Sequence, residues 1–167
     1  MEVYEAIQKR KSTRNYTEEE VKKEQIEEVL EAGRLAPYAG LAQAGREDFR
    51  HFFVIKRGSE TAEKLMDLFM APLLIVAVER GGRPAREHAA LGYVMENMWL
   101  KATEMGLGFK LCSGVSDVKD QAALKKLLGL PEEETYAFEG CSLGYAVSDV
   151  HREERREVPK MQVRYMA

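Results

Sequence analysis

The sequence EHAALGYVMENMWLKATEMGLG, residues 87–108, contains the clearest helical pattern in the chain. Apolar residues recur on one helical face, and glycines follow the last turn. We predict a helix from Glu87 to Met105 that ends at Gly106, because glycine readily adopts the conformation that closes a helix. The large apolar residues of this helix are predicted to be core residues rather than a cofactor-binding set: Met95, Met98, Trp99 and Met105.

The segment Gly106-Leu107-Gly108 resembles a dinucleotide-binding loop in composition but not in position. In the Rossmann pattern the glycines follow a strand and precede a helix, whereas here they follow a helix. We therefore interpret them as a helix C-cap and a tight turn. Ser113-Gly114, at the far end of the next apolar segment, can still offer backbone N–H groups to a ligand.

The segments on both sides of this helix predict further helices and strands. A Thr17-to-Glu20 capping box is predicted to open a helix that runs to about Leu35, where Ala36-Pro37 ends it. Residues Leu73 to Val78 are all apolar, which is typical of a strand buried on both faces. The other predicted helices are Val3 to Lys9, a short one around Leu65 and Asp120 to Leu128, and the other predicted strands are His51 to Lys56, Phe109 to Cys112 and Tyr136 to Tyr145. With a loop from Arg80 to Arg86, this mixture indicates an α+β fold.

Composition and charge narrow the class of protein. The 167 residues are 45% hydrophobic and 32% charged, which suits a single domain with one core. A formal net charge of -3 argues against a general nucleic-acid binder. The N-terminus is charged from its start and the longest apolar run, residues 71–78, is too short to cross a bilayer, so we expect a cytoplasmic protein.

The sequence shows no clear motif for a metal site or for a nucleophilic catalytic residue. Cys112 and Cys141 form no CxxC pair, and we predict that both are small core residues. The three histidines are scattered, so no metal site is predicted. No serine lies in a GxSxG context, and no Ser/His/Asp set is recognisable.

A basic cluster follows the first predicted helix. Arg10, Lys11, Ser12 and Arg14 place three cations and a hydroxyl within five positions. Such a set suits a dianionic phosphate, because arginine offers a planar fork of donors and lysine a compact charge. By these residues alone it is more typical of a basic helix end that complements the helix dipole. Arg152, Arg155 and Arg156 near the C-terminus are, by themselves, typical of a solvated surface.

The order of these motifs resembles that of the nitroreductase family over nearly the whole chain. EAI at residues 5–7 and RKSTRNY at residues 10–16 are similar to the family's opening helix and its Arg-Arg-Ser-x-Arg-x-aromatic pattern. EAGRLAP at residues 31–37 is similar to the segment that runs into an Ala-Pro-Ser loop. Residues 97–108 resemble the family's central helix with its Gly-Leu-Gly ending. Two later landmarks also match, LGLP at residues 128–131 and SLGY at residues 142–145.

The resemblance implies one domain over residues 1–167, with a central, mostly antiparallel sheet flanked by helices and an intertwined homodimer. It also implies that flavin mononucleotide (FMN) binds at the subunit interface. Arg10 and Ser12 would hold the FMN phosphate, and Lys11 would support the phosphate or the ribityl chain. Arg14 would lie near the N1/C2=O edge of the ring, where a cation stabilises the anionic reduced flavin.

Further contacts are implied at the ring. Ser113 and Gly114 would offer backbone N–H groups to its O4/N5 edge, and Arg155 or Arg156 would reach back to the phosphate. The other subunit would cover the flavin with Pro37, Tyr38, Ala39 and Leu41.

The loop that would cover the flavin departs from the family pattern Ser-x-x-Asn-x-Gln-Pro-Trp. Tyr38 replaces the first serine, Leu41 the asparagine and Ala44-Gly45 the Pro-Trp, while Gln43 is retained. The segment from Lys56 to Pro72 is short, and residues 80–86 leave no room for the lid helices of larger members. Between Arg156 and Pro159 the tail has one residue more than the family pattern leads us to expect. These departures concern substrate choice and part of the flavin contacts.

The implied activity is ping-pong two-electron transfer. NAD(P)H would pass a hydride to the flavin N5, and a nitroaromatic, quinone or similar acceptor would then be reduced. Because the flavin carries the chemistry, no catalytic side chain is required. Tyr38 would favour planar substrates through aromatic stacking. Two alternatives stay open: a flavin carrier or sensor homodimer that does not turn over NAD(P)H, and another reaction on the same fold, such as reductive dehalogenation or dehydrogenation of a modified peptide.

Overall fold

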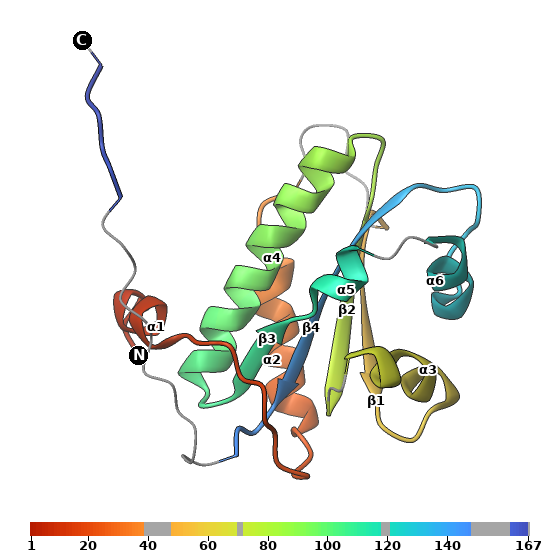
Figure 1. Ribbon diagram of the computed structural model, residues 1–167, viewed down its shortest axis with the longest axis horizontal. Coiled ribbons are helices and arrows are strands. Elements are labelled where there is room, and N and C mark those ends of the chain that lie inside the picture. Colours follow the sequence, from red (N-terminus) through yellow and green to blue (C-terminus); the bar gives the residue numbers. More distant parts are fainter. Residues whose placement is uncertain (39–47, 70–71, 118–120, 148–160, 167) are drawn as a thin grey trace.

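A four-stranded antiparallel sheet lies at the centre of the computed structural model, which describes residues 1–38, 48–69, 72–117, 121–147 and 161–166 (Figure 1). The strand order is β1-β2-β4-β3. The bounds of the strands are β1 Arg50–Lys56, β2 Leu73–Arg80, β3 Gly108–Leu111 and β4 Tyr136–Gly144. The expected α+β class with an antiparallel sheet is confirmed.

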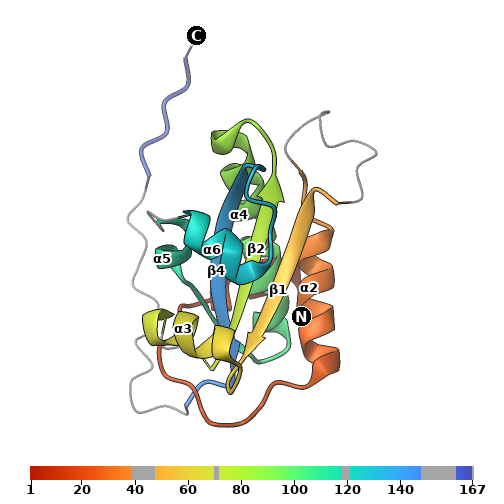
Figure 2. The same cartoon turned by 90° about the vertical axis from the view of Figure 1, so that its right-hand side faces the viewer.

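Helices cover both faces of this sheet (Figures 1 and 2). The long helix α4 and α2 lie on one face, and α3, α5 and α6 lie on the other. Helix α1 packs against α4. The bounds are α1 Val3–Lys9, α2 Lys23–Arg34, α3 Glu60–Phe69, α4 Pro84–Glu104, α5 Ser113–Ser116 and α6 Gln121–Leu128.

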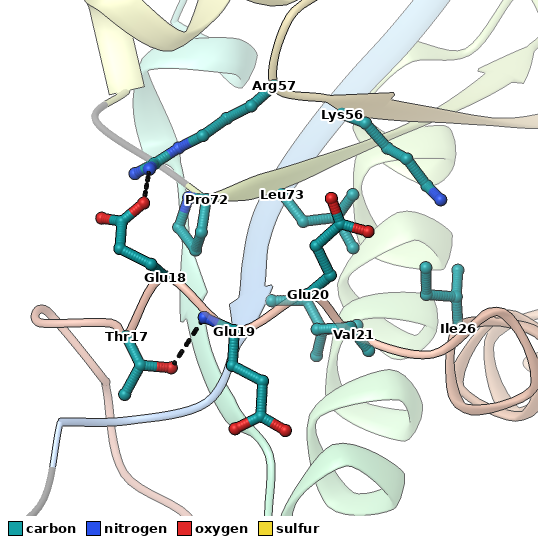
Figure 3. A pocket seen from close by; sticks show the side chains of 11 residues that line it. Thr17, Glu18, Glu19, Glu20, Val21, Ile26, Lys56, Arg57, Pro72 and Leu73 are labelled. Carbon is teal, nitrogen blue, oxygen red and sulfur yellow. Dashed lines mark hydrogen bonds and ion pairs between the residues drawn. The ribbon is translucent and has the colours of Figure 1, made fainter.

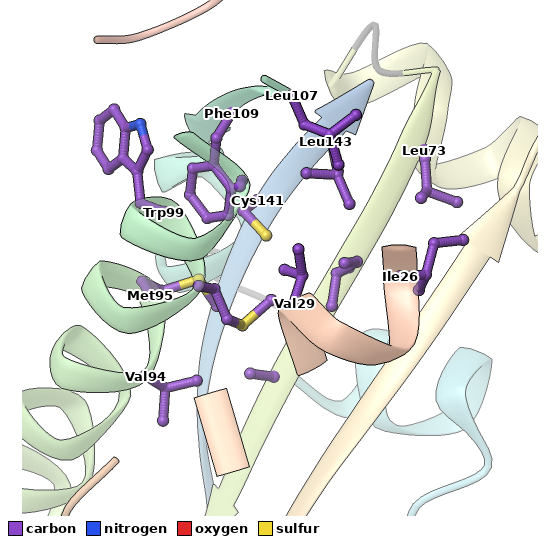
Figure 4. Packing of buried hydrophobic residues seen from close by; sticks show 14 of the residues in the cluster. Ile26, Val29, Leu73, Val94, Met95, Trp99, Leu107, Phe109, Cys141 and Leu143 are labelled. Carbon is purple, nitrogen blue, oxygen red and sulfur yellow. The ribbon is translucent and has the colours of Figure 1, made fainter. Parts of the chain in front are cut away.

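Strand alternation divides the core into two layers. Side chains of β2 and β4 alternate between the two faces, so that Ile75 packs with the α4 layer and Val76 with the α6 layer. Residues 73–79 of β2 are all buried, which confirms the prediction of a strand buried on both faces. In the α4 layer, Trp99 stacks on Phe109 with ring centroids 5.3 Å apart (Figure 4). Met95, Met98 and Trp99 are buried, as predicted for core residues.

The predicted start of the second helix is wrong. Helix α2 begins at Lys23, not after Thr17, and its first turn is capped when the Lys22 backbone N–H donates to Gln25 Oε1 at 3.2 Å. The Tyr16–Ala146 bridge and the bond from the Thr17 backbone N–H to the Tyr145 carbonyl, at 2.8 Å, align this part of the chain with the end of β4 instead of with a helix. That bond holds Thr17 in an extended segment beside the sheet.

Helix α4 starts three residues earlier than predicted, at Pro84. Proline suits the first helical position, where a backbone N–H would have no intrahelical partner. The buried Glu87 carboxylate accepts two bonds from the Arg83 backbone N–H, at 3.0 and 3.1 Å, and so satisfies a donor just before the helix. The predicted loop from Arg80 to Arg86 is therefore shorter. At the other end, Gly106 has a φ of 74°, which confirms it as the C-cap glycine.

Candidate functional site

The basic cluster lies on an extended segment at the β3 side of the sheet. Only Arg10 belongs to the helix end, as the C-cap residue of α1, and the residues after it leave the helix. Ser12 forms a parallel bridge with Phe109, and the Thr13 N–H donates to the Phe109 carbonyl at 2.9 Å. Further on, the Val147 N–H donates to the Asn15 carbonyl at 3.1 Å. Because Lys11, Ser12 and Arg14 lie beyond the helix, the helix-dipole interpretation accounts for Arg10 at most.

Two glycines allow this segment to approach the sheet closely. A Cβ on Gly108 would lie 2.7 Å from Thr13 Cγ2, and one on Gly144 would lie 2.8 Å from Tyr16 Cδ1. Both distances are too short for a real side chain. The tight-turn interpretation of Gly108 therefore missed its second role, which is to leave room for Thr13.

Helix α4 holds the first residues of the segment in place. The Arg10 guanidinium lies 4.6 Å from the centroid of the Trp99 ring, and its Nε lies 2.7 Å from Glu96 Oε1. Trp99 Nε1 donates to the Lys11 carbonyl at 3.3 Å. Among the described residues, the buried Nε of Arg10 has no hydrogen-bond partner of good geometry. Arg10 is thus fixed in place by stacking on Trp99 and by the charge of Glu96, with its side chain 29% exposed.

Tyr16 ties the end of the segment to the central strand β4. Its hydroxyl lies 2.8 Å from Ser142 Oγ, and the contact is partly buried. Burial raises the pKa of Tyr16, so the phenol stays protonated around neutral pH. The sequence pattern required only an aromatic residue here and gave no sign of this bond.

Ser113 and Gly114 lie further along the same side of the sheet. They begin the short helix α5 directly after β3, and both are exposed. Even as fully extended chain, the four steps from Phe109 to Ser113 span at most about 13–14 Å. The basic segment and the Ser113-Gly114 backbone therefore both lie at the β3 edge of the sheet.

An acidic residue that the sequence analysis missed lies beside them. The Leu111↔Cys141 pairing and the bond from Cys112 N–H to the Gly140 carbonyl place Glu139 opposite Ser113. Glu139 Oε1 lies 3.6 Å from His88 Nδ1 of α4. Burial raises the pKa of Glu139, His88 opposes that rise and Asp117 adds to it. A glutamate within an apolar strand was the available signal.

Pro37 and Tyr38 lie at the opposite edge of the sheet, near the start of β1. Tyr38 is 48% exposed, and its ring centroid lies 5.3 Å from that of Phe49. Three strand spacings of about 4.8 Å separate β1 from β3, or about 14 Å. One chain therefore does not bring Tyr38 to the basic segment. Four other implied residues lie outside the described residues: Ala39, Leu41, Arg155 and Arg156.

A separate cavity of about 230 Å³ lies between the start of α2, the end of β1 and the start of β2 (Figure 3). Glutamates 18–20 and the cations Lys56 and Arg57 surround it, and Arg57 pairs with Glu18 at 2.5 Å. Its lining includes none of the residues implied in flavin binding. The candidate site is instead an open surface beside β3.

Across the described ranges, no three His, Cys, Asp or Glu side chains are grouped closely enough to hold a metal ion. Each helix in that part of the chain is too short or too polar to cross a membrane. Cys112 and Cys141 are free thiols buried in the two core layers, as predicted, and burial raises the pKa of both.

Comparison with known proteins then decides the family. The family model described as the nitroreductase family matches residues 7–74 and 62–145. The chain belongs to the nitroreductase family. A curated relative from Archaeoglobus fulgidus, provisionally named NADH dehydrogenase/NAD(P)H nitroreductase, is 32% identical over 155 residues. That match covers 83% of this chain and 82% of the relative.

Solved structures place this nitroreductase-family chain in the expected fold. A nitroreductase with bound FMN from Bacteroides fragilis superposes with a TM-score of 0.78 at 19% identity, covering 99% of this chain and 100% of that one. A provisionally assigned nitroreductase from Desulfovibrio desulfuricans, in complex with FMN, gives a TM-score of 0.72 at 25% identity. That second match covers 97% of this chain and 98% of the other. The nitroreductase-like fold expected from the sequence is confirmed.

Proposed function

We propose that this nitroreductase-family chain is an FMN-dependent NAD(P)H oxidoreductase. The observation that carries the proposal is the fixed basic segment, residues 10–17, at the same β3 edge of the sheet as the exposed Ser113-Gly114 backbone. FMN in the two similar structures and NAD(P)H in the name of the curated relative support it. We take residues 1–167 as one FMN-binding domain, and a cytoplasmic location stays a prediction.

The basic segment suits the phosphate end of FMN. The Arg10 guanidinium is held beside this surface by Trp99 and Glu96, and Ser12 is exposed. Guanidinium donors and a hydroxyl bind a dianionic phosphate with charge-assisted hydrogen bonds. Lys11 would support the phosphate or ribityl chain, and Arg14 would stabilise negative charge at the N1/C2=O edge of the ring.

Ser113 and Gly114 would bind the O4/N5 edge of the ring through their backbone N–H groups. When bound, FMN supplies two-electron transfer between NAD(P)H and an organic acceptor such as a nitroaromatic or a quinone. The residues of this chain would bind and orient the ring and exclude water from it. No side chain needs to act as a nucleophile.

A homodimer would complete the site. The basic segment and Tyr38 lie on opposite sides of one sheet, so Pro37 and Tyr38, with Ala39 and Leu41, would cover the partner's flavin. Exposed apolar residues on α1 and α4 suit such an interface, among them Tyr4 and Tyr93. Arg155 or Arg156 would contact the phosphate.

The first test is flavin uptake and reduction by the purified full chain. The protein should bind FMN, acquire the visible absorption of an oxidised flavin, and lose it when NADH or NADPH is added without oxygen. Adding a nitroaromatic or a quinone should restore the colour. Light scattering should give the mass of a dimer. A protein that takes up no FMN would contradict the proposal.

A flavin carrier or sensor is the second candidate. The exposed Tyr38 at the position of the family's loop serine favours it, because this ring changes the surface that would face a nicotinamide. FMN-loaded protein that neither NADH nor NADPH reduces would favour this candidate over the enzyme.

A further inference from the structure

A buried ion pair joins the start of β1 to the end of β2. Arg50 and Glu79 are direct neighbours in the strand register. Arg50 Nε and Nη2 donate to Glu79 Oε2 at 3.0 and 2.7 Å. The Arg50 side chain is 5% exposed and that of Glu79 is 0% exposed. Two charges are therefore held almost entirely away from water.

The same guanidinium fixes the residues that lead to Tyr38. Arg50 Nη1 donates to the Ala36 carbonyl at 3.1 Å, and Nη2 donates to the Pro37 carbonyl at 2.9 Å. It also lies 5.4 Å from the centroid of the Phe49 ring, which in turn contacts the Tyr38 ring. The backbone before Tyr38 and the ring beside it are thus both in contact with Arg50.

This arrangement is better suited to fixing geometry than to raising stability. The cost of removing two charges from water cancels most of what a buried ion pair contributes to folding. The planar guanidinium, however, binds Glu79 and two carbonyls at once in one orientation. Without the Glu79 charge, Arg50 would be drawn toward water and would leave those carbonyls.

We propose that Arg50 and Glu79 are positioning residues that place Tyr38 over the partner subunit's flavin and thereby determine how tightly planar acceptors bind. The inference rests on the proposed function. It concerns binding of the acceptor, since the residues proposed for the FMN phosphate lie on the other side of the sheet.

The test is the kinetics of Glu79→Gln in the FMN-loaded dimer. We expect the KM for a quinone to rise about tenfold while kcat and FMN affinity change by less than about twofold. Glu87→Gln is the matched control, because it also removes a buried carboxylate but one that caps α4. Glu87→Gln should lower stability and leave the quinone KM unchanged.

A second variant covers the case in which Glu79→Gln does not fold. Arg50→Lys keeps a positive charge beside Glu79 but loses the fork that reaches both carbonyls, and it should raise the same KM. In a Tyr38→Ala background, neither substitution should change the KM by more than about twofold, because the residue they position is gone. A purely structural role would give additive effects.

Hydrogen exchange of FMN-free protein gives a readout independent of turnover. Peptides covering residues 33–38 should exchange faster in Glu79→Gln than in wild type, and at the wild-type rate in Glu87→Gln. A wild type that reduces quinones, with an unchanged KM in both Glu79→Gln and Arg50→Lys, overturns this inference alone. A wild type that takes up no FMN contradicts the proposed function and this inference together.

Discussion

In the proposed dimer the basic segment, residues 10–17, would bind the flavin of its own subunit and the Tyr38 region, residues 36–38, would cover the flavin of the partner subunit, and the two regions are held in different ways. The basic segment is held mainly by its own backbone, through hydrogen bonds to Phe109 and Tyr145 of the same chain. The Tyr38 region is held by one side chain, Arg50, which a buried carboxylate keeps in place. Backbone attachment fixes the path of the basic segment, whereas the position of residues 36–38 depends on one ion pair.

The largest effect should come from removing the phosphate ligand itself. In Arg10→Ala, loss of charge-assisted hydrogen bonds worth about 1.5–3 kcal/mol should weaken FMN binding by about 10–100-fold. Titration of the FMN-free protein by flavin fluorescence measures the change. Arg34→Ala removes an exposed arginine at the end of α2 and is the control. Equal losses in both variants would show that only net charge matters.

Displacing the basic segment should have the next largest effect. In Gly108→Ala the new methyl group would overlap Thr13, and we expect a loss of about 1–3 kcal/mol in the free energy of unfolding, with weaker FMN binding. Gly82→Ala has open space around its Cβ and should change stability by less than about 0.5 kcal/mol. Urea unfolding of both variants compares them. A fully stable Gly108→Ala would mean that the segment is not held tightly.

Removing one hydrogen bond from each of two places tests whether the basic segment or helix α2 controls FMN binding. Tyr16→Phe removes the bond to Ser142 and should cost about 1 kcal/mol of stability. Tyr145→Phe removes a bond from the Tyr145 hydroxyl to Gln25 Oε1 at 2.7 Å, on the helix that leads toward Tyr38. Only Tyr16→Phe should also weaken FMN binding. The opposite ranking in flavin titrations would mean that α2, rather than the basic segment, controls the phosphate end.

The smallest effect concerns Glu139 and the pH. Burial raises the pKa of Glu139 in the folded state, so its contribution is fully present below the unfolded pKa and is lost as pH rises through the folded pKa. The stability of wild type relative to Glu139→Gln should therefore fall as the pH rises through that window. Chemical unfolding at a series of pH values measures it. If the stability of wild type relative to Glu139→Gln rose with pH instead, burial would not raise the pKa of Glu139.

The basic segment could be recognised in the sequence because its residues are nearly consecutive, and its role at the FMN phosphate stays a prediction. Arg10, Ser12 and Arg14 fall within five positions, and the surrounding motifs follow the family order. The buried β2 and the helix that ends at Gly106 were also predictable, since each has a local pattern.

The rest depends on contacts between distant parts of the chain. The local pattern at Thr17 predicts a helix start, whereas its bond to Tyr145 joins residues far apart in sequence. The Arg50–Glu79 and His88–Glu139 pairs depend on strand register and on how α4 packs against β4, which no local pattern specifies.

The width of the sheet between the basic segment and Tyr38 has a consequence for mixed dimers. Suppose one chain carries Arg10→Ala and the other Tyr38→Ala. The heterodimer would then contain one site with both defects and one with neither. The two variants, each weakly active, should therefore give higher activity when they are unfolded together and refolded as a mixture than either gives alone.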